Sequence, residues 1–194
     1  MERTTPADVL AFWFGQAGEP DYGQPRAAWF RKDPVFDETI RRRFLPAVEA
    51  ALAGDLNAWS ADRQGMLALL ILLDQFPRNL FRNTAQAFAG DPVARQLAEQ
   101  TLAHGWDRQL LPVQRVFVYL PFEHSETLRD QERSLALFGS LAAEQPGYDS
   151  YLDYAHRHNE VIVRFGRFPH RNAVLGRPST PEEADYLAQP GSGF

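Results

Sequence analysis

The sequence predicts a chain of α-helices alone, folded as one domain of packed antiparallel helical hairpins. Apolar residues recur at helical spacing, and no stretch alternates regularly enough to be a good strand. Connections between the expected helices are mostly short, which favours antiparallel neighbours. A capping side chain followed by proline, typical of a helix N-terminus, occurs at Thr5-Pro6, Asp33-Pro34, Asp91-Pro92 and Thr180-Pro181. We therefore expect a single all-α domain over residues 1–194, with a short flexible tail at 190–194.

The capped starts place four helices, near 6–14, 34–53, 92–104 and 181–189. Thr5 with Asp8 and Thr180 with Glu183 have the spacing of a capping box. Gly54 and Gly105 stand where left-handed C-terminal caps fall. Apolar periodicity adds helices near 63–76, 112–120, 126–144 and 148–165, and short helical turns near 25–31, 55–59 and 77–83.

Prolines are expected to interrupt several of these helices, because proline lacks an N–H and its ring clashes one turn back. Pro46 should kink or split the second helix, and Pro121 and Pro146 should each close one. The segment Arg115–Leu120 is the best rival for a strand, but proline follows it directly and precedes it closely.

The core is expected around the uninterrupted apolar run Met66–Leu73. A helix that is apolar on every side must be surrounded by other elements. The residues Leu69–Leu73 should therefore be almost inaccessible to solvent, and Pro77 should end the helix.

Composition excludes several classes of function. The chain has no cysteine, so it has no disulfide, thiolate metal site or cysteine nucleophile. A net charge of −5 disfavours general binding to nucleic acid or to anionic membranes. No metal-binding, phosphate-loop, dinucleotide or serine-hydrolase motif is present, so we expect no metal and no cofactor. The short apolar run Val9–Phe14 is a poor signal peptide, which favours a cytoplasmic location.

Three polar clusters interrupt otherwise ordinary helices: Asp74–Arg82, Pro121–Glu126, and His156–Arg177. The third concentrates arginine and histidine in a chain that is acidic overall, which marks a candidate surface for anions. His156, Glu160 and Arg164 lie four residues apart on one helix face, and Glu160 precedes Arg164 in the order that favours an ion pair. His158 belongs to a more apolar stripe and is interpreted as a packed histidine.

Long motifs in these clusters carry a resemblance to a known family. Asp-Gln-Phe-Pro-Arg-Asn at 74–79, Tyr-Leu-Pro-Phe-Glu-His-Ser-Glu at 119–126 and Arg-Phe-Gly-Arg-Phe-Pro-His-Arg-Asn at 164–172 resemble, in this order, the bacterial family called domain of unknown function 924. The resemblance covers nearly the whole chain from Val9. It implies an α–α superhelix of the tetratricopeptide-like class, and it carries no activity, cofactor or catalytic residue with it.

The clusters leave several functions open. Their side chains could be structural braces that satisfy helix ends and pair buried charges. They could instead converge on a pocket for an anionic small molecule. A helical scaffold that binds a peptide or protein in its concave groove, with an acidic peptide as the expected partner, is a third possibility. Hydrolysis with histidine and glutamate is a fourth, although neither His124-x-Glu126 nor His156-x-x-x-Glu160 has a third partner fixed by spacing.

The anion-pocket hypothesis assigns Arg164, Arg167 and Arg171 to the anion, with His124, Glu126 and His156 as orienting or acid–base groups. Arg167 follows Gly166 at a helix end and should be a brace to a carboxylate such as Asp74, Glu123 or Glu126. Arg171 lies in the loop beyond Pro169 and should contact the ligand from an open, hydrated position. The full set of candidate ligand-binding residues is Arg78, Asn79, Arg82, His124, Glu126, His156, Glu160, Arg164, Arg167, His170, Arg171 and Asn172.

Overall fold

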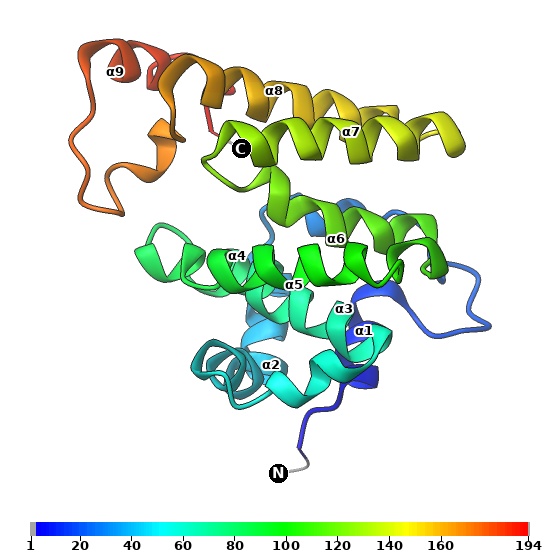
Figure 1. Cartoon of the computed structure of the whole chain (residues 1–194). Helices are drawn as coiled ribbons and strands as arrows, with labels where there is room; N and C mark the ends of the chain where they lie inside the picture. Colours follow the sequence, from blue (N-terminus) through cyan, green and yellow to red (C-terminus); the bar gives the residue numbers. More distant parts are fainter. Residues whose placement is uncertain (1–2, 194) are drawn as a thin grey trace. The chain divides into compact units, whose positions relative to one another are not determined.

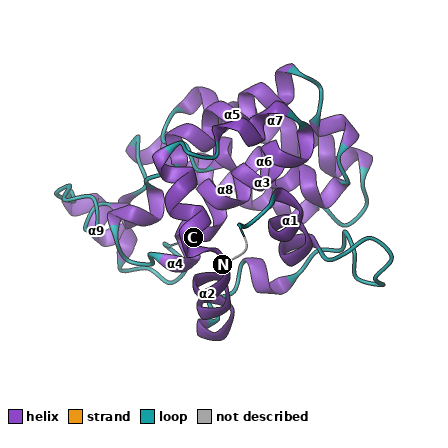
Figure 2. Ribbon diagram, turned by 90° about the horizontal axis from the view of Figure 1, so that it is seen from below, coloured by secondary structure: helices purple, strands orange, loops and turns teal. Residues whose placement is uncertain are grey.

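The computed structural model describes residues 3–193, and this part of the chain consists of helices and loops without a strand (Figures 1 and 2). The all-α prediction is therefore confirmed. The α-helices are α1 (Pro6–Phe14), α2 (Pro34–Ala53), α3 (Arg63–Leu70), α4 (Phe76–Leu80), α5 (Asp91–Ala103), α6 (Pro112–Glu123), α7 (Leu128–Glu144), α8 (Asp149–Phe165) and α9 (Pro181–Leu187). A π-helical turn spans Ile71–Gln75, and 3-10 turns span Ala27–Trp29, Asn57–Ala61, Ala85–Phe88, Asp107–Gln109 and Pro169–Arg171.

The chain divides into two compact units. The first comprises Met1–Arg82 and Gln86–Pro121, and the second comprises Asn83–Ala85 and Phe122–Phe194. Helices α1 to α5 and most of α6 belong to the first unit, and α7 to α9 belong to the second. The expectation of a single domain over the whole chain stays a prediction.

Helix starts follow the capping signals with one exception. In both expected capping boxes the threonine side chain accepts from the backbone three residues on, and the Asp8 or Glu183 side chain accepts from the threonine backbone. Asp33 accepts from the backbone of Val35 and Phe36. Asp91 is not a cap, because Gly90 occupies that position. The Asp91 carboxylate is instead engaged by Arg78, at 2.8 and 3.0 Å.

The apolar run at the end of α3 lies in the core of the first unit, as predicted. Each residue from Leu69 to Leu73 is at most 1% exposed. Helix α3 packs on α1 and α5, and the π-helical turn that follows it packs on α2 and α5. This segment is surrounded on all sides because it has no polar face to offer to water.

Pro77 does not end this helix, so that expectation is wrong. The π-helical turn Ile71–Gln75 precedes it, and the Phe76 N–H bonds to the carbonyl of Ile71, five residues back. Pro77 then lies in the first turn of α4, where a missing N–H costs little. The wider turn absorbs the clash that a proline ring makes with the preceding turn of a regular α-helix.

Two other prolines are also tolerated inside helices. Pro121 does not close α6, which continues to Glu123, and Pro46 does not split α2. The residues from Val116 to Phe122 are all buried, so packing along α6 outweighs the single backbone hydrogen bond that Pro121 removes. The same helix rules out the rival strand at Arg115–Leu120.

The second unit is built around the hairpin of α7 and α8, which lie side by side in Figure 1. Helix α8 ends at Gly166, whose positive φ of 68° places it in the left-handed region that glycine adopts freely. A small apolar core around this end contains Val161, Ile162 and Phe168, with Phe165 and Tyr186 packed against it. In the expected flexible tail, the Ser192 hydroxyl donates to the carbonyl of Leu187 at 3.1 Å, and Phe194 lies outside the described residues.

Candidate functional site

The first polar cluster is held by carboxylates of the first unit. Arg78 donates to both oxygens of Asp91 and to the Asp74 carbonyl, the latter at 2.6 Å. Arg82 donates to both oxygens of Asp37 at 2.7 and 2.9 Å, and Asn79 donates to Asp37 at 2.7 Å. Asp37 lies in the first turn of α2, so these side chains tie the end of α4 to the start of α2.

The electrostatics of Arg78 agree with a bracing role. Burial lowers the pKa of its guanidinium, but the charges of Asp74 and Asp91 outweigh burial and raise that pKa above its ordinary value. A half-buried arginine with two carboxylates beside it already has its charge compensated by the protein. The first cluster therefore gives structural support, and its candidate residues Arg78, Asn79 and Arg82 are all occupied by protein carboxylates.

Within the second unit, the second and third clusters meet at Glu126. Its carboxylate accepts from the Phe168 backbone at 2.8 Å and from both Arg177 terminal nitrogens at 2.6 and 2.9 Å. Burial raises the pKa of Glu126, but the Arg177 hydrogen bonds outweigh it and hold the pKa below its ordinary value. Glu126 is thus an ionised anchor for the loop after α8.

Arg167 and Glu183 anchor the other side of this loop. Arg167 donates to the two oxygens of Glu183 at 2.6 and 2.8 Å and to the Pro178 carbonyl at 2.9 Å. Asn172 donates to Glu183 at 3.2 Å, and hydrogen bonding from Arg167 lowers the pKa of Glu183 to about 2. Arg167 has the geometry of a brace, as predicted, but its partner is Glu183 rather than Asp74, Glu123 or Glu126.

His158 is a packed histidine, as the apolar stripe predicted. The residue is 5% exposed, and its Nδ1 lies 2.9 Å from the Tyr154 carbonyl and 3.1 Å from Glu123 Oε1. A nearby carboxylate favours the charged imidazolium, whereas burial favours the neutral ring. Burial wins and lowers the pKa of His158 to about 3, with smaller contributions from the nearby His124, Arg171 and His170.

Arg171 does not occupy an open, hydrated position, so that expectation is wrong. It is 7% exposed, and its guanidinium lies 4.5 Å from the centre of the Phe168 ring. His170 and His124 are half-buried nearby, with the His170 ring 5.6 Å from that of Phe168 and the His124 ring 6.2 Å from that of His158. The 3-10 turn Pro169–Arg171 folds this segment inward instead of leaving it as a loose loop.

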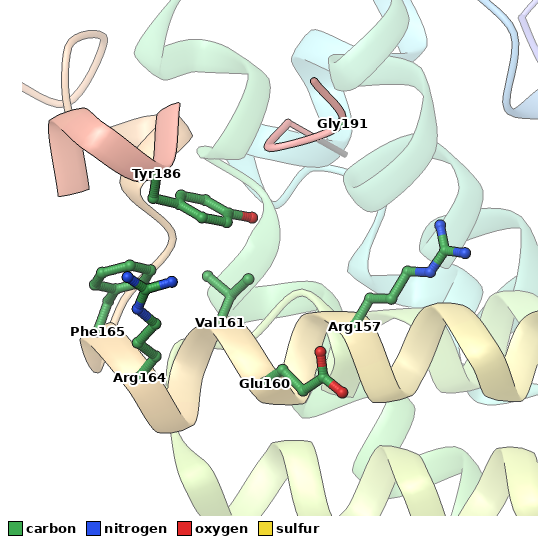
Figure 3. A pocket seen from close by; sticks show the side chains of 7 residues that line it. All are labelled: Arg157, Glu160, Val161, Arg164, Phe165, Tyr186 and Gly191. Atoms are coloured by element: carbon green, nitrogen blue, oxygen red, sulfur yellow. The ribbon is translucent and has the colours of Figure 1, made fainter. Parts of the chain in front are cut away.

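A pocket of about 240 Å³ lies between α8 and the chain around Tyr186, and Figure 3 shows its lining. Arg157, Glu160 and Arg164 follow one another along α8, while Val161, Phe165 and Tyr186 form an apolar wall. The Arg164 guanidinium lies 4.6 Å from the centre of the Phe165 ring, and that of Arg157 lies 5.2 Å from the centre of the Tyr154 ring.

The expected ion pair between Glu160 and Arg164 is not formed. Both side chains are exposed, and neither is within 4.0 Å of an oppositely charged side chain in the described part of the chain. Arg164 stacks on its sequence neighbour Phe165 instead, a cation–π contact that an exposed ion pair would not outcompete. His156 is exposed and is not part of the pocket lining.

Sequence reasoning missed several members of this site. Arg157 is seven residues before Arg164 and so lies on the same face of α8, and this spacing is the sequence signal for it. Tyr186 comes from α9, far along the chain, and no spacing rule could have found it. The capping-box spacing identified Glu183, but not its pairing with Arg167.

Residues 3–193 contain no group of three histidine, aspartate or glutamate side chains arranged to hold a metal ion. None of the described helices is both long and apolar enough to cross a membrane. The Ser125 hydroxyl, which adjoins His124 in sequence, donates to Asp130 at 2.7 Å.

Comparison with known proteins agrees with the motif resemblance. A solved structure of a protein of unknown function from Agrobacterium tumefaciens is 43% identical to this chain, with a TM-score of 0.80 over 94% of this chain and 96% of that one. No curated protein matches the sequence. The family model described as bacterial protein of unknown function (DUF924) matches residues 9–191, and the chain belongs to this family.

Proposed function

We propose that the second unit binds an anionic small molecule in the pocket lined by Arg157 and Arg164 (Figure 3). The observation that carries the proposal is that both guanidiniums line a cavity while neither forms an ion pair with any described residue. The clustered arginines Arg78, Arg82, Arg167 and Arg177, by contrast, are each held by a carboxylate. Guanidiniums without a carboxylate partner are the ones available to an external anion.

The lining also suggests what else the ligand carries. A guanidinium that stacks on an aromatic ring is held in place, while the N–H groups at its edge stay free. Little conformational entropy is therefore lost when it binds a carboxylate or phosphate. Val161, Phe165 and Tyr186 offer contact to an apolar body. Glu160 lies between the two arginines, and its carboxylate can accept a hydrogen bond from a donor on the ligand. The class that fits is a small aromatic or aliphatic carboxylate or phosphate monoester.

The test is a calorimetric titration with phenyl phosphate, which combines an anion with an aromatic body. We expect Arg164→Gln and Arg157→Gln each to weaken binding by about tenfold, the loss of one charge-assisted hydrogen-bonding group. Arg133→Gln is the matched control, because Arg133 is also exposed but lies on α7 outside the pocket lining. Equal affinity in all four proteins would refute the proposed site.

A screen of acidic peptides separates this proposal from the peptide-scaffold alternative. Thermal stabilisation by phenyl phosphate and other small anions supports the pocket. Stabilisation by acidic peptides alone, unaffected by Arg157→Gln or Arg164→Gln, would favour a peptide-binding surface elsewhere and contradict the pocket.

A further inference from the structure

The first unit contains a separate and larger cavity, of about 670 Å³. Residues of α1 and of the turn after it line one side, and Tyr22, Asp62, Gln64 and Gln114 line the rest. All of these residues belong to the first unit, so this cavity shares no residue with the pocket of Arg157 and Arg164. Its chemistry is also different, and three features define it.

The first feature is an amide donor without a protein partner, on a residue that is almost wholly buried. Gln114 is 4% exposed, and its Oε1 accepts from the Leu111 backbone at 3.1 Å. The Gln114 side-chain nitrogen makes no hydrogen bond to any described residue, and the residue lines the cavity. Because this nitrogen keeps some accessible surface and Gln114 lines the cavity, water or a ligand held there can accept from it. Gln114 therefore offers hydrogen bonds to something held in the cavity.

The second feature is negative charge. Asp8 and Asp62 line the cavity, and no lysine, arginine or histidine among the described residues does so. Asp62 caps α3, because its Oδ1 accepts hydrogen bonds from the backbone N–H groups of Gln64 and Gly65 at 2.9 and 3.0 Å. The Oδ2 of Asp8 accepts a hydrogen bond from the backbone N–H of Thr5. One oxygen of each carboxylate thus remains for other donors. Hydrogen bonds from Thr5, with a contribution from the charge of Arg43, hold the pKa of Asp8 below its ordinary value, so it is ionised at neutral pH.

The third feature is an apolar wall on α1. Pro6, Leu10, Ala11 and Phe14 line the cavity between the polar groups, and Phe14 is fully buried beneath it. Such a mixture of a mostly apolar wall and a few directed polar groups is typical of small-molecule sites.

We propose that this cavity is a second binding site, for a small organic amine whose apolar body carries a hydrogen-bond acceptor. The protonated amine pairs with the free carboxylate oxygen of Asp8 or of Asp62. The apolar body of the ligand packs on Leu10 and Phe14, and its acceptor atom accepts a hydrogen bond from the side-chain nitrogen of Gln114. This site selects cations, whereas the pocket of Arg157 and Arg164 selects anions.

The test compares two probes with the same body and opposite charge, tyramine and 3-(4-hydroxyphenyl)propanoate. Each is titrated into the full-length protein, and binding is followed by calorimetry and by backbone amide shifts in NMR spectra. We expect tyramine to shift amides of α1 and of residues near Gln114, and the propanoate to bind there at least about tenfold more weakly, because the carboxylates repel it.

Two variants locate the site. Ala7→Phe places a large side chain at an exposed position of the lining, so it fills the cavity without disturbing the core, and it should abolish tyramine binding. Gln114→Leu should weaken tyramine binding by about five- to tenfold through the lost hydrogen bond. Gln100→Leu is the matched control, since Gln100 is exposed on α5 and outside the lining.

Melting temperatures of all variants confirm that each is folded before it is titrated. The proposal is overturned if the amine and the acid bind at this site with equal affinity, or if Ala7→Phe leaves tyramine binding unchanged. Arg157 and Arg164 lie outside this cavity, so Arg157→Gln and Arg164→Gln should leave the affinity for tyramine unchanged. The tyramine titration therefore tests this cavity independently of the anion pocket.

Discussion

Single titratable residues carry much of the electrostatic behaviour of the second unit, and His158 is the clearest case. Its folded-state pKa of about 3 lies well below the ordinary histidine value of about 6.5. The unfolded chain therefore binds one more proton than the folded chain between these two values. Stability contributed by keeping His158 neutral is complete above pH 6.5 and is lost as the pH falls towards 3.

We expect His158→Gln to flatten the acid side of the stability profile. Glutamine can still donate to Glu123 or to the Tyr154 carbonyl but has no proton to gain. From pH 6.5 to 4.5 the parent should lose roughly 2–3 kcal/mol through this residue alone, at about 1.4 kcal/mol per pH unit, and the variant should not. Urea midpoints at pH 7, 5.5 and 4.5 measure the difference. Parallel profiles for the two proteins would contradict the low pKa.

Arg167 and Arg164 show how two arginines three residues apart play different roles. Arg167 is bidentate to Glu183, which is 2% exposed, whereas Arg164 is exposed without an ion pair to any described residue. Removing Arg167 strands a buried carboxylate, while removing Arg164 strands nothing.

Arg167→Ala should therefore clearly lower the urea midpoint of unfolding at pH 7. The midpoint of Arg164→Ala should stay close to that of the parent protein. The difference should shrink at pH values near 2, where Glu183 becomes protonated and no longer needs a cation. Equal midpoints for the two variants at pH 7 would show that the Glu183 pair does not brace the fold.

At the scale of elements, the π-helical turn Ile71–Gln75 is tightly packed within the first unit. It joins α3 to α4 through a proline, and the backbone of Gly90 lies directly against the backbone of Leu73 inside it. A side chain at Gly90 would meet the Leu73 carbonyl, and the surrounding core leaves that carbonyl no room to move.

Gly90→Ala should accordingly destabilise the protein by about 1–3 kcal/mol, as an overpacking change. Gly139→Ala is the control, because Gly139 lies inside α7 with nothing near its missing side chain. That change should stabilise the protein by about 0.5–1 kcal/mol through helix propensity. Thermal or urea unfolding measures both, and a neutral Gly90→Ala would mean that the backbone contact is loose.

For the whole molecule, the distribution of aromatic residues allows the single-domain prediction to be tested. All four tryptophans, Trp13, Trp29, Trp59 and Trp106, belong to the first unit, so their fluorescence reports that unit alone. Far-ultraviolet circular dichroism reports the helices of both units.

If the chain is one cooperative domain, Arg167→Ala in the second unit should lower the fluorescence midpoint and the circular dichroism midpoint equally. Coincident urea transitions in both the parent and the variant are the expected result. A variant that shifts the dichroism transition but leaves tryptophan fluorescence unchanged would show two independent domains.

Much of the fold could be read from the sequence because the signals are local. Capping boxes at Thr5 and Thr180, left-handed glycines at 54 and 105, and the uninterrupted apolar run of α3 each act within a few residues, and the structure confirms each. Hydrogen bonds and burial that are decided over one or two turns need no knowledge of distant segments.

Tertiary structure decided whether helices end at their prolines and which groups pair with each charged side chain. Local rules predict that helices end at Pro77 and Pro121. Both helices continue past the proline, because the surrounding apolar residues are buried there, and a π-helical turn precedes Pro77. Local spacing pairs Glu160 with Arg164 and leaves Arg171 in an open loop, yet one arginine stacks on Phe165 and the other is buried beside Phe168. Which carboxylate holds which arginine depends on segments up to about 50 residues apart, such as Glu126 and Arg177. Only tertiary packing determines such contacts, because the spacing of residues within one helix does not show which distant residues lie beside it in the folded chain.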